Sequence, residues 1–181
     1  GGMYREVYVQ VRNKTHLADV FVKPQIHPLQ VTTEITVQNI SDGITLQQEI
    51  RKKGEGAYSP LGQKPVKQTN VQTVFPVQEI CLWEPENPHL YEIRTSLWKN
   101  GEMIDARVDI TGFREAGFRK DGFYLNGKKL RLRGLNRHQS YPYVGYAAPA
   151  SMQIFDADIL KKELGVNAVR TSHYPQSQDF I

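Results

Sequence analysis

Cysteine and long apolar runs are nearly absent from this chain of 181 residues. The single cysteine, Cys81, excludes an internal disulfide and a cysteine-based metal cluster, and it is compatible with a reducing compartment, which slightly favours the cytoplasm. No apolar run reaches the roughly 18 residues that a membrane-spanning helix needs, so no membrane span is expected. The first residues, Gly1-Gly2-Met3-Tyr4-Arg5, carry no pattern of a secretory signal.

A strong excess of one charge is also missing. The formal net charge is +4, and 23% of the residues are charged. Basic residues are densest in the segment 128–133, where they alternate with leucines as on the solvated face of a strand. No nucleic-acid partner is therefore expected.

What the chain has is period-2 alternation of apolar and polar residues, the mark of half-buried strands. The alternation is clearest at 31–38, 44–51 and 91–97. In each segment every second residue falls on one face. These residues are Val31, Thr33, Ile35 and Val37 in the first segment, Ile44, Leu46, Gln48 and Ile50 in the second, and Tyr91, Ile93, Thr95 and Leu97 in the third. Segments 4–11 and 16–22 are further candidate strands, and 52–70 is expected to be a mobile loop. Asn100-Gly101 predicts a tight hairpin, with Ile104, Ala106, Val108 and Ile110 pointing inward on the returning strand. About seven short strands over 100 residues predict an immunoglobulin-like β-sandwich.

The pattern changes after Phe113. A second hairpin is expected around Asn126-Gly127, followed by a strand at Leu130–Arg133. Ser151 is a candidate N-cap for a helix that Gly165 ends, and Val166–Arg170 is predicted to be a buried parallel strand. Strand, helix, strand is the opening unit of an α/β fold.

Four segments resemble family-2 glycoside hydrolases, the family of the large β-galactosidases, in the family's order. They are 2–7 (GMYREV), 82–91 (LWEPENPHLY), the group 112–115, 125–128 and 133–138 (GFRE, LNGK and RGLNRH), and the signature 167–175 (NAVRTSHYP). The Asn136-Arg137-His138 form favours the β-galactosidase branch over the β-glucuronidase branch.

The resemblance implies a mainly β chain: an immunoglobulin-like β-sandwich followed by the first β-α-β portion of a truncated (β/α)₈ barrel. On this basis residues 1–13 would end a jelly-roll sugar-binding domain, 14–116 would form the sandwich, and 117–181 would begin the catalytic barrel. The resemblance also implies that the chain is part of a longer protein, here called the parent. The parent would be a retaining enzyme acting on terminal β-D-galactosides, with a possible homo-oligomeric state.

Candidate site residues follow the two predicted barrel strands. Active sites of such barrels lie at the carboxyl ends of the strands, which places His138, Ser172, His173 and Tyr174 on one face. The resemblance implies that His138 and His173 bind sugar hydroxyls, for which a neutral imidazole offers one donor and one acceptor. A buried histidine satisfied by its neighbours is the structural alternative.

Three residues are expected to support this site. A buried Arg170 would need a carboxylate partner, and the resemblance suggests the nucleophile or a neighbour of it. A structural ion pair in the barrel core is the alternative. Asn136 would shape the pocket rim or its loop, and Tyr174 would fix the backbone rather than touch sugar.

A pair of catalytic carboxylates is not apparent. Retaining glycosidases need two carboxyl groups about 5 Å apart, and the resemblance implies that both are glutamates supplied beyond Ile181. Asp156, Asp158, Glu84 and Glu86 are more simply solvated charges. No metal site is expected here, although Mg²⁺ in the full-length parent would fit the resemblance. A non-catalytic carbohydrate-binding or scaffold module is the competing interpretation, and β-glucuronides or β-mannosides are the competing substrates.

Overall fold

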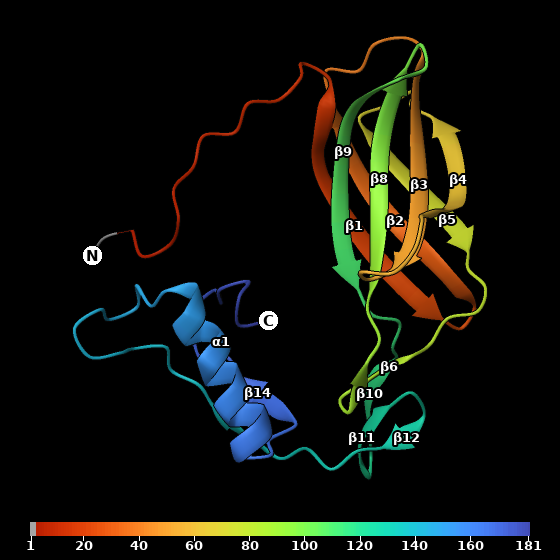
Figure 1. Cartoon of the computed structure of the whole chain (residues 1–181). Helices are drawn as coiled ribbons and strands as arrows, with labels where there is room; N and C mark the ends of the chain where they lie inside the picture. Colours follow the sequence, from red (N-terminus) through yellow and green to blue (C-terminus); the bar gives the residue numbers. More distant parts are fainter. Residues whose placement is uncertain (1–2) are drawn as a thin grey trace. The chain divides into compact units, whose positions relative to one another are not determined.

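The computed structural model describes residues 3–181, and the chain divides into two compact units. The larger unit is Val11–Lys129, and the smaller unit combines Gly1–Gln10 with Leu130–Ile181 (Figure 1). Gly2, the first residue of the segment that resembles the end of a sugar-binding domain, lies outside the described residues.

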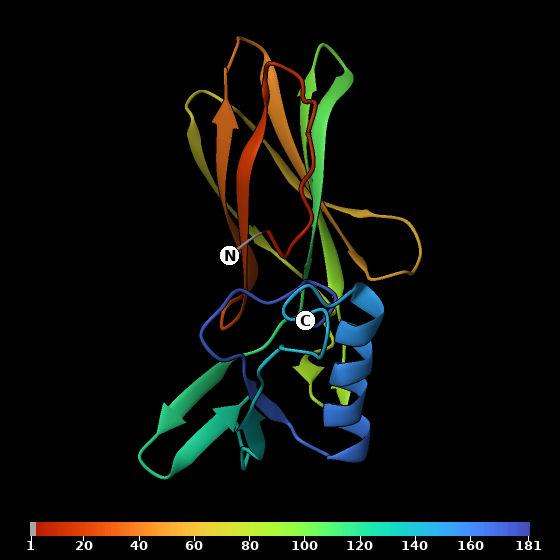
Figure 2. The same cartoon turned by 90° about the vertical axis from the view of Figure 1, so that its left-hand side faces the viewer.

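The larger unit is an immunoglobulin-like sandwich of two antiparallel sheets (Figures 1 and 2). One sheet has the order β1-β2-β5, made of β1 (His16–Ile26), β2 (Leu29–Gln38) and β5 (Asn70–Pro76). The other has the order β4-β3-β8-β9, made of β4 (Ser59–Pro65), β3 (Ile44–Lys52), β8 (Tyr91–Lys99) and β9 (Glu102–Thr111).

The predicted inward faces of β2, β3 and β8 are confirmed, because all their named residues are buried. They form two apolar clusters, one around Leu46 and Leu97 and one around Ile93 and Phe113. Gln48 is also fully buried here. Its amide nitrogen donates to the hydroxyls of Thr33 and Thr95, each at 3.0 Å, and its oxygen accepts from Thr73 at 2.6 Å.

The predicted inward face of β9 is wrong. A bulge pairs Leu97 with Asp105 and Trp98 with Met103, which leaves Ile104 as an extra residue. A one-residue slip moves every following side chain to the opposite face. Ile104 still packs against the core, whereas Ala106, Val108 and Ile110 are exposed.

Two further strand assignments are corrected. Part of the loop expected at 52–70 is strand β4, which is polar because it lies at the edge of its sheet with most residues exposed. Segment 4–11, expected as a strand, forms none, because no other segment pairs with it in the described part of the chain.

Short hairpins complete the larger unit. They comprise β6 (Trp83–Glu84) with β7 (Asn87–Pro88), and the sheet of β10 (Ala116–Arg119), β11 (Gly122–Leu125) and β12 (Lys128–Lys129). Both predicted Asn-Gly turns are confirmed. Their residues have positive φ, at 52° and 82° for Asn100 and Gly101 and at 49° and 77° for Asn126 and Gly127.

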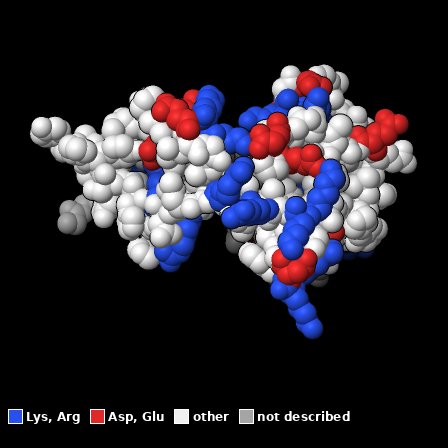
Figure 3. Space-filling model, turned by 90° about the horizontal axis from the view of Figure 1, so that it is seen from below, with Lys and Arg blue, Asp and Glu red and all other residues white. Residues whose placement is uncertain are grey.

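Lysine and arginine side chains on the face shown in Figure 3 have acidic side chains among them. Lys128 pairs with Glu84 and Lys129 with Asp121, both within the larger unit. Two of the four cations in the basic segment 128–133 are therefore paired. No helix within residues 3–181 is long and apolar enough to cross a membrane.

The smaller unit contains the predicted β-α-β order, with shifted boundaries. Its elements are β13 (Gly134–Asn136), α1 (Ala150–Asp158), the π-helical turn η1 (Ile159–Glu163) and β14 (Ala168–Arg170). The strand expected at Leu130–Arg133 starts only at Gly134. The helix is capped by Pro149, so Ser151 is not its N-cap, while Gly165, at φ 61°, does follow its end.

Candidate functional site

Strands β13 and β14 pair in parallel and hold the candidate residues at one end of the β-α-β unit. Gly134 lies opposite Ala168, and Asn136 lies opposite Arg170. A Cβ atom on Gly134 would lie 2.3 Å from the Ala168 carbonyl oxygen, so only glycine allows this approach. The pairing continues one residue further, where the Arg137 N–H donates to the Arg170 carbonyl at 2.9 Å.

The side chain of Asn167 fixes the other end of the strand pair. Its oxygen accepts from the Arg133 N–H at 2.8 Å, and its nitrogen donates to the Arg131 carbonyl at 3.0 Å. The first residue of the signature segment therefore aligns the two strands, which sets where both of them end.

The loops that leave the two strands bring His138, His173 and Tyr174 together. The imidazole centroids of His138 and His173 are 5.9 Å apart, and the His138 and Tyr174 rings are 6.3 Å apart. Both histidines are exposed in the described chain. His173 has a φ of 56°, a left-handed conformation that is uncommon for a residue with a side chain.

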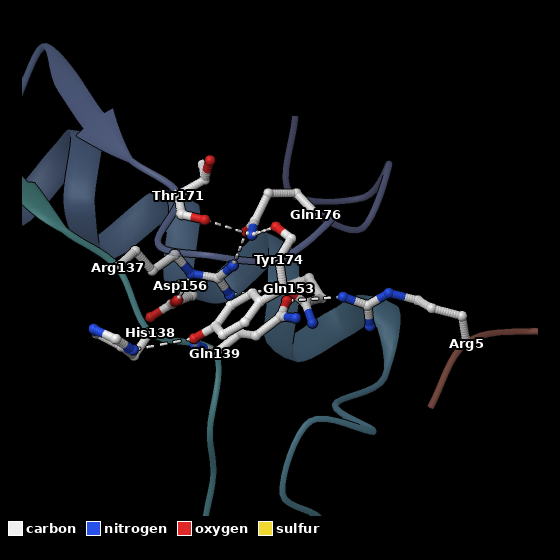
Figure 4. A network of polar contacts seen from close by, with 9 residues as sticks. All are labelled: Arg5, Arg137, His138, Gln139, Gln153, Asp156, Thr171, Tyr174 and Gln176. Carbon is white, nitrogen blue, oxygen red and sulfur yellow. Dashed lines mark hydrogen bonds and ion pairs between the residues drawn. The ribbon is translucent and has the colours of Figure 1, made fainter. Parts of the chain in front are cut away.

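Tyr174 contacts His138 through its hydroxyl group. The Tyr174 Oη lies 3.2 Å from His138 Nδ1 and accepts the Gln139 N–H at 3.1 Å (Figure 4). The Tyr174 ring also packs against Tyr146, with centroids 5.3 Å apart. Tyr174 thus links the loop after β14 to the loop after β13.

Asn136 and Arg170 lie opposite each other at the ends of the two strands, and both are exposed. Arg170 was expected to be buried, and this is wrong for the described chain because β14 is a short strand paired only with β13. No ion pair of Arg170 is present among residues 3–181. Its expected carboxylate partner therefore remains a prediction.

Arg137 joins three segments of the smaller unit beneath the exposed residues, and its side chain is only 3% exposed. Its Nε atom pairs with Asp156 of α1, and its two other nitrogens donate to Gln153 at 2.7 Å and Gln176 at 2.9 Å (Figure 4). The guanidinium carbon lies 3.8 Å from the centroid of the Phe180 ring. Gln176 in turn donates to the carbonyls of Thr171 and Tyr174.

This arrangement corrects one expectation. Asp156 is not a solvated charge, because it pairs with the buried side chain of Arg137. Sequence reasoning missed both because they lie 19 positions apart and meet only in space. One signal was available: Gln153 and Asp156 are three apart on a helix, so they share a face, and a polar pair on a covered face needs a partner.

Gln139 is a further residue that sequence reasoning missed. It is 1% exposed, and its side-chain oxygen accepts from Arg5 Nη2 at 2.8 Å. The ring of Tyr4 lies 6.0 Å from that of Tyr146. The N-terminal segment of the smaller unit therefore supports the loop that carries His138.

Two of the other acidic candidates form ion pairs. Asp158 pairs with Lys162 at 2.8 Å, as the i,i+4 spacing predicts, and Glu84 pairs with Lys128 at 3.3 Å. Within the described residues, no three His, Cys, Asp or Glu side chains are grouped so that they could hold a metal ion. The arrangement offers hydrogen-bonding groups and an exposed arginine for a polar ligand.

Family models match most of the chain. The model for Glycosyl hydrolases family 2 matches residues 15–114, and that for the TIM barrel domain of the same family matches residues 117–181.

Individual relatives agree with these models. A β-galactosidase of Thermoanaerobacter pseudethanolicus is 41% identical over the whole chain, which spans 25% of that relative. A putative β-glucuronidase of Formosa agariphila is 30% identical over 99% of the chain, which spans 22% of it.

Solved structures share the fold. The β-galacturonidase of Eisenbergiella tayi bound to galacturonate has a TM-score of 0.73 and 30% identity, and the match covers 93% of this chain and 31% of that one. The β-glucuronidase 2 of Bacteroides uniformis has a TM-score of 0.79 and 27% identity, covering 92% and 22%. The chain thus spans about a quarter of the length of the curated relatives it matches. It belongs to glycosyl hydrolases family 2, with an immunoglobulin-like domain followed by the start of the barrel.

Proposed function

We propose that this chain is the middle part of a retaining glycoside hydrolase that cleaves terminal β-D-galactosides through a covalent glycosyl-enzyme intermediate. The observation that carries the proposal is the meeting of His138 and His173 at the carboxyl ends of β13 and β14, where barrel enzymes place their sites. The 41% identity to a β-galactosidase supports the choice of sugar.

In this proposal His138 and His173 bind hydroxyl groups of the galactosyl unit. Arg170, exposed at the end of β14, is available to a carboxylate of the nucleophile or its neighbourhood. Asn136 and Tyr174 support the site. The two catalytic glutamates would come from barrel strands later in the full-length protein. In that protein, residues 1–13 would end a jelly-roll domain, residues 14–116 would form the sandwich domain and residues 117–181 would begin the barrel.

Mg²⁺ in the parent is part of the same proposal. The residues described here do not fit a magnesium site, since they contain no group of three suitable side chains. No step is therefore assigned to the ion, and its ligands would lie on later strands.

A uronic-acid substrate is the second candidate, because relatives named β-glucuronidase and β-galacturonidase also match. Such a substrate calls for extra cationic groups opposite its carboxylate. Arg137, the cation next to His138 in sequence, is already engaged by Asp156, Gln153 and Gln176. Arg170, the exposed cation at the end of β14, is assigned in this proposal to a carboxylate of the protein, so a galactoside fits the described residues better. The match of residues 117–181 to a barrel domain counts against a non-catalytic module.

Hydrolysis of nitrophenyl β-galactoside, β-glucuronide and β-mannoside by the full-length parent tests the proposal, with the 181-residue chain as a control. Galactoside turnover by the parent alone is expected. Turnover of the glucuronide instead of the galactoside would favour the uronic-acid substrate. Turnover by the 181-residue chain after repurification would show that a carboxylate pair lies within it.

The roles of the two histidines are tested in the same parent by His138→Ala and His173→Ala. Loss of one hydrogen bond to substrate should lower kcat/KM about 10- to 100-fold. His89→Ala in the sandwich domain is the matched control and should leave kcat/KM unchanged. Equal losses in all three variants would contradict the assignment.

A further inference from the structure

We infer that Tyr174 fixes the tautomer of His138, so that His138 carries its proton on Nε2 and presents a hydrogen-bond donor to the ligand. This deepens the proposed function and rests on it for the identity of the ligand as a sugar. Tyr174 is a positioning residue here, since it acts through His138.

The inference starts from the one proton of the Tyr174 hydroxyl. The Gln139 N–H is a donor in every state of the protein, and it lies 3.1 Å from Tyr174 Oη. The hydroxyl oxygen must therefore accept at this contact, which leaves its own proton free for a second partner.

His138 Nδ1 is that second partner, 3.2 Å from the same oxygen. If Nδ1 carried a proton, it would also have to donate to Oη, and the hydroxyl proton would need another acceptor. If Nδ1 is bare, the hydroxyl donates to it and both contacts are satisfied together. A neutral imidazole has one donor and one acceptor nitrogen, so a bare Nδ1 places the proton on Nε2.

Neighbouring residues hold the two hydrogen bonds of the Tyr174 hydroxyl in place. Gln139 is 1% exposed and is tied to Arg5, while its neighbour Arg137 is 3% exposed and is tied to α1. Tyr174 is half-buried against Tyr146, and its own carbonyl accepts from Gln176. Both ends of the contact therefore lie on segments anchored by buried polar groups.

The second ring nitrogen of His138 points away from Tyr174 (Figure 4), and the residue as a whole is exposed. A proton on this nitrogen makes His138 a donor to an oxygen of the ligand. A ligand that offered only a donor at this point would leave both donors unpaired once it displaced water from them, which costs binding free energy.

The test is nitrogen NMR of the 181-residue chain labelled with ¹⁵N-histidine, because a protonated and a bare ring nitrogen resonate far apart. At a pH where His138 is neutral, the wild type should show a bare Nδ1 and a protonated Nε2. Tyr174→Phe keeps the ring and removes the hydroxyl. It should lower the ratio of the Nε2–H to the Nδ1–H tautomer about fivefold, which corresponds to one ordinary hydrogen bond.

Two controls make the result decisive. His173, whose ring faces that of His138 but which is not among the hydrogen-bond partners shown for the Tyr174 hydroxyl, should keep its spectrum in the variant and report that the fold is intact. Tyr143→Phe, at an exposed tyrosine of the same unit, should change neither histidine. A protonated Nδ1 in the wild type would overturn the inference whether or not the variant folds, as would an unchanged ratio in a folded variant. The readout needs no substrate, so failure of the galactoside proposal in hydrolysis assays would be recognised separately.

Discussion

At the scale of single residues, Arg137 connects several segments of the smaller unit. One guanidinium group contacts a helix, the loop after β14 and the ring of Phe180, all from a buried position. Removing one partner of a buried ion pair leaves the other charge uncompensated, which is the costly case.

Arg137→Met should therefore lower the free energy of opening of the smaller unit by about 2–3 kcal/mol, because the hydrogen bonds to Gln153 and Gln176 and the pair with the partly exposed Asp156 are lost together. Hydrogen exchange of the amides of β13, α1 and β14 measures this loss. Asp158→Asn, which breaks only the exposed pair with Lys162, is the matched control and should cost about 0.3–0.5 kcal/mol. Equal exchange in the two variants would refute a structural role for the Arg137 network.

Ionisation of the Asp109 carboxyl group lowers the stability of the sandwich domain. Burial raises the pKa of its carboxyl group above the ordinary value, and the charge of Asp19 acts in the same direction, while Arg107 opposes both. One of its oxygens has no hydrogen-bond partner among the described residues. The folded state thus keeps the Asp109 proton to a higher pH than the unfolded state does.

The sign of the pH dependence follows from this. Where the folded state binds more protons, stability falls as pH rises, here from about pH 4, the ordinary value for an unfolded chain, up through the folded pKa. Asp109→Asn removes the titration, so the Tm of the variant minus that of the wild type should increase with pH across this range. A difference that stays constant or decreases would show that the pair with Arg107 outweighs burial.

At the scale of elements, alternation predicted the strands that are paired on both sides and packed on one face. β2, β3 and β8 all behave this way, and both Asn-Gly turns adopt the positive φ that their sequence requires. β9 could not be predicted in full, because the bulge opposite Trp98 leaves no mark in residue type. β4 escaped notice because an edge strand with exposed side chains carries no apolar alternation.

Part of the candidate site could likewise be predicted from the sequence, and part could not. The meeting of His138, His173 and Tyr174 followed from strand order, because carboxyl ends of parallel strands share one edge. The partners of Arg137 did not, since they depend on where a helix and two irregular loops come to lie in space. Pairing of that kind has no local signature.

The polar group inside the sandwich gives a prediction for β3. Gln48→Leu keeps the size of the side chain but leaves the hydroxyls of Thr33, Thr73 and Thr95 without their buried partner. The free energy of unfolding should fall by about 2–4 kcal/mol, as expected when several buried polar groups lose a hydrogen bond together. Urea denaturation followed by tryptophan fluorescence measures it.

Gln47→Leu is the matched control, because Gln47 is the neighbour on the opposite, half-exposed face of β3. It should change stability by no more than about 0.5 kcal/mol. A loss at Gln47 as large as that at Gln48 would mean that strand propensity, rather than the buried network, explains the effect.

At the scale of the whole molecule, apolar side chains remain exposed on the smaller unit. Leu164, Phe155 and Ile154 of the helical segment are 59%, 65% and 51% exposed, whereas Ile159, Val166 and Val169 are half-buried. Exposed apolar surface promotes association. The 181-residue chain should therefore show a sedimentation coefficient that rises with concentration.

The double variant Phe155→Lys/Leu164→Lys should abolish this rise. Met103→Lys, at an exposed apolar residue of β9, is the control and should leave association unchanged. If the control variant alone removed the association, the contact would lie on the sandwich instead.

The uneven placement of apolar residues also means that the two units respond differently to heat. Both clusters of buried apolar side chains found in residues 3–181 lie in the sandwich, while the smaller unit relies on the hydrogen bonds around Arg137. The heat-capacity increment of unfolding arises from newly hydrated apolar surface and is reduced by polar surface. The sandwich should thus account for most of the curvature in the stability profile of this chain, and the enthalpy of unfolding of the site-bearing unit should depend less steeply on temperature.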